Sequence, residues 1–503
     1  MIFDYIGMFK AGRPTQLAIT YTCLTAFVLF DYDQGVFGGL LTNPDLLTIM
    51  GNPNSGKLGI IVACYNLAGA FGCLLNFWVG PKYGKKVVIA LAMTLVTIGA
   101  VLQCTTYGVP QLVVGRVITG LGVGIDVATV PTYQSELSKR GNRGRLVMTE
   151  IVFVTVGVVV AYFFDVGMSY VDGPVAWRLP IACQCLLALI VLGLIGGLPE
   201  TPRYLIQRGL ISDAEAVLAK VWNVPTSDPA VQQEKDEIIR ANDLERSNPF
   251  KWTAAWSKDA VRTRWRLFLA VFVLFTNQWT GANAIVFYAP TIMEQNVGLS
   301  HTSALIAGGC INMGNMMGAF FSCLISDRIG RKKPLLIGLI GQSIFMMLFG
   351  VMIKYSHVGP ATGKAAIAFL LWYEICFGAS SSSIPWLYSA EILPIRVRAQ
   401  GTSLAVFTNW MWQFTIVMAT PTMISNLGWE TYMIFMSFGF AFVPMVYFWV
   451  VETKNLGLEE IDYLFLSERA PQGEHPADVS LGGIETGEIK EKVAYEESPV
   501  SKA

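Results

Sequence analysis

The stretch FDYDQGVFGG, from Phe30 to Gly39, decides which fold this sequence predicts. It continues a run without charge that begins at Leu17, so Asp31 and Asp33 stand inside a segment with the composition of a membrane-spanning helix. A charged group at the centre of a bilayer costs roughly 2.5 to 3.5 kcal/mol even on scales derived from membrane insertion. Carboxylates in such a position are therefore expected to have a function.

The composition is that of an integral membrane protein. Of 503 residues, 53% are hydrophobic and 14% are charged, whereas a soluble globular protein carries about 25% charged residues. The hydrophobic residues gather into about twelve blocks, and a helix needs roughly 20 apolar residues to cross a hydrocarbon core about 30 Å thick. The expected spans are 17–39, 57–79, 86–106, 109–133, 146–166, 179–198, 267–290, 303–325, 335–354, 365–390, 400–424 and 431–451.

The basic residues are distributed unevenly between the loops that join these spans. Lys and Arg gather in alternate short loops, at 82–86, 139–145, 328–333 and 396–398, and cytoplasmic loops collect such residues. We therefore expect both termini and the long 199–266 segment to face the cytoplasm, in a multi-pass protein of the plasma membrane. The first apolar run is too long for the h-region of a cleavable secretory signal.

The spans form two groups of six, separated by a polar segment with helical periodicity. This pattern predicts an all-α membrane protein with about twelve transmembrane helices in two six-helix bundles. After about residue 468 the composition becomes typical of disorder. The expected units are a cytoplasmic N-terminal tail (1–16), the first bundle (17–198), a cytoplasmic linker with short helices (199–266), the second bundle (267–451) and a cytoplasmic tail (452–503).

Three pairs of motifs indicate that the second bundle repeats the first. PTYQSELSKRGNRGR (131–145) and PWLYSAEILPIRVRAQG (385–401) carry Tyr, Glu and Arg at the same mutual spacing. GPKYGKK (80–86) corresponds to SDRIGRKK (326–333), and PETPR (199–203) to VETKN (451–455). Parallel six-helix repeats of this kind place a substrate site near the bilayer midplane, between the two halves.

The motifs resemble those of the sugar porter family of the major facilitator superfamily, from the first span to the end of the twelfth. They appear in the family's order as YDQGVFGG, GRVITGLGVG, PTYQSE with RGR, LPETPR, TGANAIVFYAPTI, DRIGRKK and PWLYSAEILPIRVR. The resemblance implies the major facilitator fold and alternating-access transport of a sugar or polyol across the lipid bilayer. The tail lies outside it.

The resemblance gives one of the two opening acids a role. Asp31 and Asp33 lie about 200° apart around a helix, so they cannot share a face. The family carries an Asp at the position of Asp33 and usually a Gly at that of Asp31, and Arg116 matches the arginine that partners this Asp in proton-coupled members. The resemblance therefore implies that Asp33 carries the proton and Arg116 regulates it. The alternative is an ion pair with a structural role only, and Asp31, Asp126 and Glu150 have no assigned role.

The candidate substrate site consists of amides and aromatic side chains. A polyhydroxylated ligand needs groups that donate and accept hydrogen bonds, together with an aromatic face for its C–H surface. Buried amides can also serve only to hold helices together, which is the alternative for each position. The residues that match sugar-contacting, lining or gating positions of the family are Phe30, Asn277, Gln278, Asn283, Tyr288, Asn315, Trp386, Asn409 and Gln413.

Departures from the family pattern keep the substrate open. Asn277 replaces the first Gln of the family's usual Gln-Gln pair, and Ile151 and Val158 stand where glucose-type members carry glutamines on span five. A site that lacks a needed hydrogen bond can discriminate strongly against a substrate, so glucose is not assumed. Pentoses, glycerol, other polyols and sugar acids remain candidates, with sugar acids the weaker choice because Arg116 is the only cation expected in the pocket.

The repeated loop motifs resemble the family's cytoplasmic gate, a charge network that holds the bundles together on the inside while the outside is open. The alternative is that the basic residues obey the inside rule alone, which does not account for the repeated acids. The expected gate residues are Glu136, Arg143, Glu200, Arg203, Asp327, Arg328, Arg331, Glu391, Arg398 and Glu452.

The leading hypothesis is a proton-coupled symporter that imports a small neutral sugar or polyol. The alternatives are a facilitative uniporter and a sugar sensor that does not transport, although sensors of this type usually carry a longer tail. The sequence contains no nucleophile–base or metal-ligand constellation, so we expect no enzyme activity, cofactor, metal or nucleic-acid partner. The protein is expected to act as a monomer.

Overall fold

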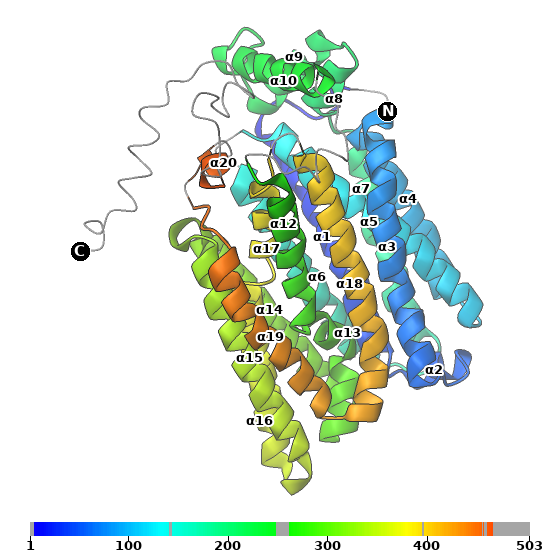
Figure 1. Cartoon of the computed structure of the whole chain (residues 1–503). Coiled ribbons are helices and arrows are strands. Elements are labelled where there is room, and N and C mark those ends of the chain that lie inside the picture. Colours follow the sequence, from blue (N-terminus) through cyan, green and yellow to red (C-terminus); the bar gives the residue numbers. More distant parts are fainter. Residues whose placement is uncertain are drawn as a thin grey trace.

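The computed structural model describes residues 5–139, 143–247, 261–394, 397–454, 456 and 460–465, and its regular elements are helices (Figure 1). The helices of the first half are α1 (Arg13–Leu40), α2 (Pro44–Ile49), α3 (Ser55–Tyr83), α4 (Lys85–Cys104), α5 (Val109–Leu137), α6 (Arg143–Met168) and α7 (Val175–Ile195). Three helices follow before the second half: α8 (Pro202–Gln207), α9 (Ile211–Trp222) and α10 (Pro229–Ser247). The elements of the second half are α12 (Thr263–Trp279), α13 (Ala282–Ile292), the π-helix η2 (Met293–Val297), α14 (His301–Ile329), α15 (Lys332–Lys354), the 3₁₀-helix η3 (Ser356–Val358), α16 (Pro360–Ala379), α17 (Ile384–Glu391), α18 (Arg398–Leu427), α19 (Glu430–Trp449) and α20 (Glu460–Leu464).

Apart from the polar helix α10 of 19 residues, twelve helical segments of the described chain are long enough to cross a membrane. Ten of them are also apolar enough over their length. The other two, α1 and α18, have 28 and 30 residues, which at 1.5 Å per residue gives roughly 42 and 45 Å against a hydrocarbon core of about 30 Å. These two helices are more polar because they carry carboxylates and amides that face protein. The expected twelve-span architecture is therefore confirmed.

Two of the spans are interrupted near their middle. The span Thr263–Val297 consists of α12, α13 and η2, and the span Pro360–Glu391 consists of α16 and α17. The first break lies at Thr280 and Gly281, and the second at 380–383. Transporters commonly use such discontinuous helices to build a substrate site, because the break frees backbone groups in the middle of the protein.

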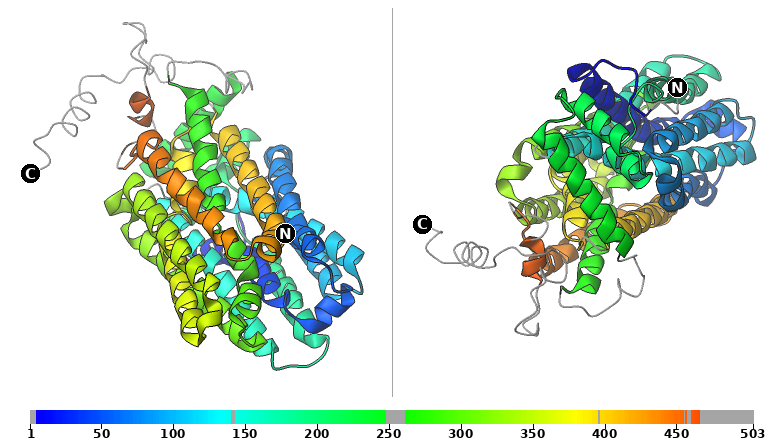
Figure 2. Two further views of the ribbon diagram at one scale, coloured as in Figure 1. Left: turned by 60° about the horizontal axis from the view of Figure 1, so that its bottom comes forward. Right: turned by 90° about the horizontal axis from the view of Figure 1, so that it is seen from above.

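The spans assemble into two bundles, which Figure 2 shows as the blue to cyan helices beside the green to orange helices. Within the first bundle α1 packs against α6 and α7, and within the second α14 and α15 pack against α16. Between the bundles α3 packs against α18, and α6 against α14. These pairs join the second span to the eleventh and the fifth to the eighth, as expected for two halves that repeat.

A layer formed by α8, α9 and α10 covers one end of the bundles (Figure 1). The start of α1 is tied to this layer, because the Gly12 N–H donates to the carbonyl of Lys220 at 2.8 Å and Gln16 Nε2 donates to that of Val221 at 2.7 Å. We call this end the α9 end and the opposite one the α2 end. The tail expected to be disordered after 468 lies outside the described residues.

Candidate functional site

Asp33 is buried in an ion pair with Arg116. Arg116 Nη1, from α5, donates to Asp33 Oδ2, from α1, at 2.6 Å, and the two side chains are 0% and 1% exposed. Two charges buried in the membrane-spanning part of a protein are tolerated only where they pair closely with each other. The structure thus brings together the two residues that the sequence paired.

Arg116 has further support besides the carboxylate. Its guanidinium carbon lies 3.9 Å from the centre of the Phe37 ring and 4.4 Å from that of Tyr65. Its Nη2 donates to the carbonyl of Val62 at 3.3 Å. A cation over aromatic faces is stabilised by the negative ring face, so the arginine keeps favourable contacts that do not depend on Asp33.

Four of the predicted substrate residues form one hydrogen-bonded cluster beside the breaks in the interrupted spans. Gln278 Nε2, in the last turn of α12, donates to Asn277 Oδ1 at 3.1 Å and to Asn409 Oδ1, on α18, at 3.0 Å. Asn283 Nδ2, in the first turn of α13, donates to Gln278 Oε1 at 2.5 Å. Asn277 Nδ2 donates to the Ser381 carbonyl, in the break between α16 and α17, at 2.5 Å.

The cluster continues across the bundle interface to α1. Gln413 Nε2, one turn beyond Asn409, donates to Asn283 Oδ1 at 3.4 Å and to Gln34 Oε1, on α1, at 2.9 Å. Gln34 Nε2 in turn donates to Asp31 Oδ1 at 2.7 Å. The hydrogen bonds therefore run without interruption from one bundle to the other, which is the place where repeat transporters bind their substrates.

An aromatic contact accompanies the amides. Trp410, on α18, is 1% exposed and packs among first-bundle residues. Its ring centre lies 5.7 Å from that of Phe30 and 6.2 Å from that of Tyr65. A β-carbon on Gly69 of α3 would lie 2.9 Å from the Trp410 ring, so the glycine makes room for it. Phe30 therefore contacts the residue that follows Asn409 on α18, and its role as a lining residue stays a prediction.

Three predicted residues lie in other contacts. The Tyr288 hydroxyl donates to the carbonyl of Val417 at 2.9 Å, and this ring is buried within the second bundle. Asn315 packs α14 against α16, because a β-carbon on Gly378 would lie 2.1 Å from its backbone carbonyl oxygen. Trp386 packs against an apolar cluster of the second bundle near the α9 end. The structure brings none of these three into the amide cluster through a hydrogen bond of the described residues.

The α6 positions that lack glutamine present an apolar surface to α1. Val158 is 3% exposed, and its Cα and carbonyl oxygen would both lie 3.0 Å from a β-carbon on Gly35. Ile151 lies one and a half to two turns closer to the α9 end. The first bundle therefore contributes polar groups to the site from α1 rather than from this part of α6.

Two of the predicted gate carboxylates cap helices, one in each half. Glu200 accepts hydrogen bonds from the N–H groups of Lys85 and Lys86 at 3.1 and 3.2 Å, at the start of α4. Glu452 accepts from the N–H groups of Arg331 and Lys332 at 2.7 and 3.1 Å, at the start of α15. A carboxylate at a helix N-terminus satisfies free N–H groups and is attracted by the helix dipole.

The glycine before each of these helices is required by the cap. Gly84 has a φ of 85° and Gly330 one of 92°, a region that side chains disfavour. A β-carbon there would lie 2.5 Å from Glu200 Oε2 in the first half and 2.6 Å from Glu452 Oε2 in the second. Burial raises the pKa of Glu200 to about 7, although the hydrogen bonds from the N–H groups of Thr201, Lys86 and Lys85 lower it. The repeat seen in the sequence is thus a repeat of structure at the α9 end.

The other gate residues also lie at the α9 end. Arg331 Nη2 and Nε donate to the two carboxylate oxygens of Glu391 at 2.9 and 3.3 Å, within the second bundle. Arg398 Nε donates to the carbonyl of Leu393 at 3.1 Å. Glu136 is half-buried at the end of α5, and Arg203 and Arg328 are exposed. The side chains of Arg143 and Asp327 lie outside the described residues.

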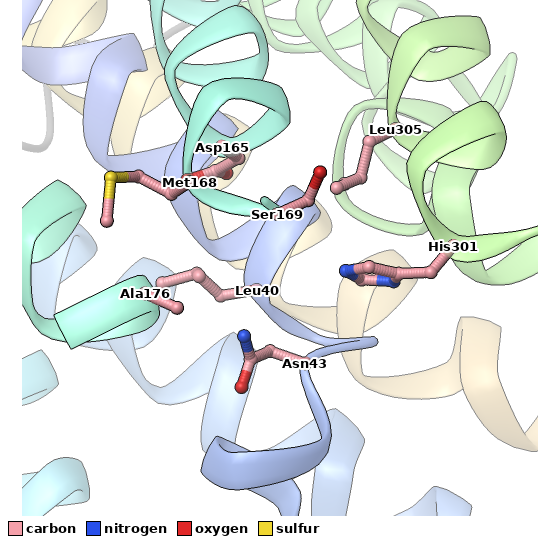
Figure 3. Close-up of a pocket in the computed structure, with 9 residues that line it drawn as sticks. Leu40, Asn43, Asp165, Met168, Ser169, Ala176, His301 and Leu305 are labelled. Carbon is pink, nitrogen blue, oxygen red and sulfur yellow. The ribbon is translucent and has the colours of Figure 1, made fainter. Parts of the chain in front are cut away.

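At the α2 end the two bundles touch directly. Thr42 Oγ1 lies 3.1 Å from His301 Nδ1, which also lies 2.8 Å from Glu294 Oε1. Ser169 Oγ lies 3.2 Å from Thr302 Oγ1. Figure 3 shows the small pocket beside these contacts, with His301 and Leu305 of α14 facing side chains from the first bundle. Its labelled lining residues are Leu40, Asn43, Asp165, Met168, Ser169, Ala176, His301 and Leu305. The structure is therefore closed at the α2 end.

The sequence pointed to the amides but did not identify Gln34, which joins them to α1, or Trp410, whose ring packs beside Phe30 and Tyr65. Gln34 lies inside the quoted opening stretch, one turn from Asp31, so the helical spacing could have placed both on one face. Trp410 directly follows Asn409, but nothing in the sequence shows that its ring enters the other bundle.

Known proteins share this architecture and sequence. The profile of the family described as "Sugar (and other) transporter" matches residues 18–465. The MFS-type transporter oryC of Aspergillus oryzae is 33% identical, with 93% of this chain and 88% of that protein covered. The sugar transporter STL1 of Saccharomyces cerevisiae is 30% identical, with 90% and 82% covered.

A solved structure shows the same fold. The proton:xylose symporter XylE from E. coli, bound to 6-bromo-6-deoxy-D-glucose, superposes with a TM-score of 0.76 at 24% identity and covers 90% of this chain and 99% of that one. The match of sequence over nearly the whole chain and the match of fold agree. The chain belongs to the sugar porter family of the major facilitator superfamily and is a multi-pass membrane transporter rather than an enzyme.

Proposed function

We propose that the protein is a proton-coupled symporter that imports a small neutral sugar or polyol by alternating access, with Asp33 as the proton carrier and Arg116 as its regulator. The observation that carries this proposal is the buried pair of Asp33 and Arg116, in which the cation has a second set of partners. A carboxylate that must take up and release a proton needs a partner that remains stable in both states.

The surroundings of Arg116 supply this stability. When Asp33 is protonated the ion pair is lost, but the guanidinium still lies over Phe37 and Tyr65 and still donates to the carbonyl of Val62. Removing one partner from a buried ion pair usually costs about 3 to 5 kcal/mol, and these contacts reduce that cost. Protonation can thus weaken the link between α1 and α5 without leaving an isolated charge.

The position of α1 connects this event to the substrate site. Asp33 lies on the same helix as Gln34, which joins the first bundle to Gln413 of the second. A change in the packing of α1 on α5 would therefore move Gln34 and alter its hydrogen bond with Gln413. A membrane potential of 100 mV is worth about 2.3 kcal/mol per proton, which corresponds to roughly forty-fold accumulation.

The chemistry of the cluster supports a neutral, hydroxyl-rich substrate. Amides of Gln278, Asn283 and Gln413 can donate and accept at once, and the described cluster contains no Lys or Arg side chain. Its amides bond to one another in this structure, so substrate hydroxyls would replace existing hydrogen bonds rather than fill empty positions. The sugar transporter STL1, to which the chain is similar, points to the same class of substrate.

Contacts at the two ends support the transport cycle. The bundles touch at the α2 end through Thr42 and His301 and through Ser169 and Thr302. We place the α9 end, where basic loops gather, on the cytoplasmic side of the plasma membrane. The contacts at the α2 end would then close the outward path, and the gate residues at the α9 end would close the inward path in the opposite state. We further propose that one chain is sufficient for transport.

Uptake into reconstituted vesicles tests the proposal. The wild-type protein is given labelled glucose, galactose, xylose, arabinose, glycerol and inositol, with and without an inward proton gradient. We expect the gradient to drive accumulation of at least one of them, and Asp33→Asn to lose accumulation while retaining exchange. Uptake of an accepted sugar that ignores the gradient would identify a facilitative uniporter instead, and accumulation by Asp33→Asn would place the proton elsewhere.

A further inference from the structure

The second carboxylate of the opening stretch, Asp31, faces a different part of the molecule from Asp33. Asp31 and Gln34 are three residues apart, about 60° around α1, so they share one face, whereas Asp33 lies about 200° from Asp31. The face of Asp31 and Gln34 meets α18, because Gln34 bonds to Gln413 there. The face of Asp33 meets α5 through Arg116.

Asp31 is accessible and has no cation partner. It is half-buried, while Asp33 is 1% exposed. Among the described residues no Lys or Arg side chain is ion-paired with Asp31, and its side chain accepts a hydrogen bond from Gln34 Nε2 at 2.7 Å. A carboxylate has two oxygens with about four acceptor positions, so Asp31 retains acceptor capacity beyond this single bond.

The hydrogen bond from Gln34 also fixes the direction of the cluster. Gln34 Nε2 donates to Asp31 Oδ1 and Gln34 Oε1 accepts from Gln413 Nε2, so the amide nitrogen of Gln34 points toward Asp31 and its oxygen toward Gln413. Gln413 then donates to both Gln34 and Asn283. Asp31 thus sets which ends of these amides are presented at the bundle interface, in addition to presenting its own oxygens.

Among the described residues, no side chain of α6 hydrogen-bonds to the amide cluster or to Asp31. Val158 of α6 packs its backbone against Gly35 and offers an apolar side chain. A hydroxylated substrate held between the bundles needs partners on both sides, because a hydroxyl that loses water without a replacement bond is costly. Asp31 and Gln34 are the polar side chains that α1 places opposite the amides of the second bundle.

We infer that Asp31 and Gln34 form the first-bundle face of the substrate site, with Asp31 accepting hydrogen bonds from substrate hydroxyls and Gln34 positioned by it. This inference rests on the proposed sugar or polyol transport and deepens it. A carboxylate without a cation attracts hydroxyl donors and repels anions. The site therefore selects neutral polyols and sugars over sugar acids.

The test measures substrate preference under conditions that need no proton gradient. Full-length protein in vesicles carries out counterflow at equal pH on both sides, with the neutral substrate that the wild type accepts best and with glucuronate. The variants are Asp31→Asn, Asp31→Gly and Asp31→Glu. Asp172→Asn, in an exposed loop, is the matched loss of one acid, and melting temperatures show that each variant is folded.

We expect Asp31→Asn and Asp31→Gly to raise KM for the neutral substrate about tenfold, equivalent to about 1.4 kcal/mol. Charge-assisted hydrogen bonds have this magnitude. The preference for the neutral substrate over glucuronate should fall by at least the same factor, and Asp31→Glu should recover part of both. The Asp172 variant should match the wild type.

An unchanged KM and an unchanged preference in folded Asp31 variants would overturn the inference. A variant that keeps its KM but changes the number of protons moved per substrate would also overturn it, since Asp31 would then be a proton site. Failure of the proposed coupling is distinguishable, because it shows in the wild type, as uptake that ignores the gradient. A wild type that accepts no sugar or polyol would remove both conclusions.

Discussion

Removing one partner of the buried pair should destabilise the protein by different amounts depending on which partner is lost. In Arg116→Gln the protein loses the ion pair and both aromatic contacts of the guanidinium. In Asp33→Asn it loses the ion pair alone, because Phe37 and Tyr65 still face the cation and the new amide oxygen can still accept from it.

The contacts give the size of the difference. Each cation–π contact is worth about 0.5 to 2 kcal/mol, and one retained hydrogen bond adds about 1 kcal/mol. We therefore expect Arg116→Gln to cost about 2 to 5 kcal/mol more than Asp33→Asn. The double variant should cost less than the sum of the two single variants, because the residues interact directly.

Thermal unfolding in detergent, followed by tryptophan fluorescence, measures this order. The midpoint of Arg116→Gln should lie several degrees below that of Asp33→Asn, since for a unit of 150 to 250 residues 1 kcal/mol corresponds to about 2 to 4 °C. Because Asp33→Asn resembles the protonated carrier, a small loss for that variant fits a cycle through the protonated state. Equal losses, or a larger loss for Asp33→Asn, would refute the reasoning about Arg116.

Three further variants test other contacts. Burial raises the pKa of Glu200 from 4.5 to about 7, so the carboxyl group holds a proton more strongly in the folded than in the unfolded state. The stability of the wild type should therefore fall as the pH rises from 4.5 to about 7. In Glu200→Gln the melting temperature should depend less on pH across this range. Gly330→Ala should lower the melting midpoint by an amount corresponding to more than the roughly 1 to 2 kcal/mol that a left-handed backbone costs a side chain, because its β-carbon also meets a carboxylate at 2.6 Å. Gly173→Ala has a similar φ of 86° but nothing within 4 Å, so an equal loss there would contradict the steric argument. Trp410→Ala should lower the stability by about 3 to 5 kcal/mol in the same assay. Trp78 is 65% exposed, so Trp78→Ala should change the stability little. Similar losses for both variants would show that the Trp410 ring does not hold the bundles together.

Much of the architecture was predictable because the bilayer restricts the options. A chain in hydrocarbon must satisfy its backbone groups within helices, so the hydrophobic blocks predict spans and the basic loops predict their order. The repeated motifs around residues 80–86 and 326–333 also predicted two equivalent halves. The interruptions of the seventh and tenth spans were not predicted, although Thr280 and Gly281 mark the first break and four consecutive serines at 380–383 mark the second.

The candidate site was only partly predictable. The sequence named Asn277, Gln278, Asn283, Asn409 and Gln413, and the structure joins all five in one cluster. Their functional roles stay predictions. Side-chain direction depends on how each helix is rotated against neighbours that are distant in sequence, and this rotation decides which polar groups meet.

The gate illustrates the same limit. The sequence showed matching acids at Glu200 and Glu452 and suggested a network of charged side chains. In the structure both carboxylates bind backbone N–H groups of their own half. Such partners leave no trace in a sequence pattern, because nearly every residue carries an N–H group.

The two helix caps have a consequence for the lifetime of the folded protein. Because Glu200 and Glu452 each fasten the start of a helix within one half, the rocking of one half against the other need not disturb either fastening. A defect in either cap should therefore shorten the lifetime of the folded protein in the membrane.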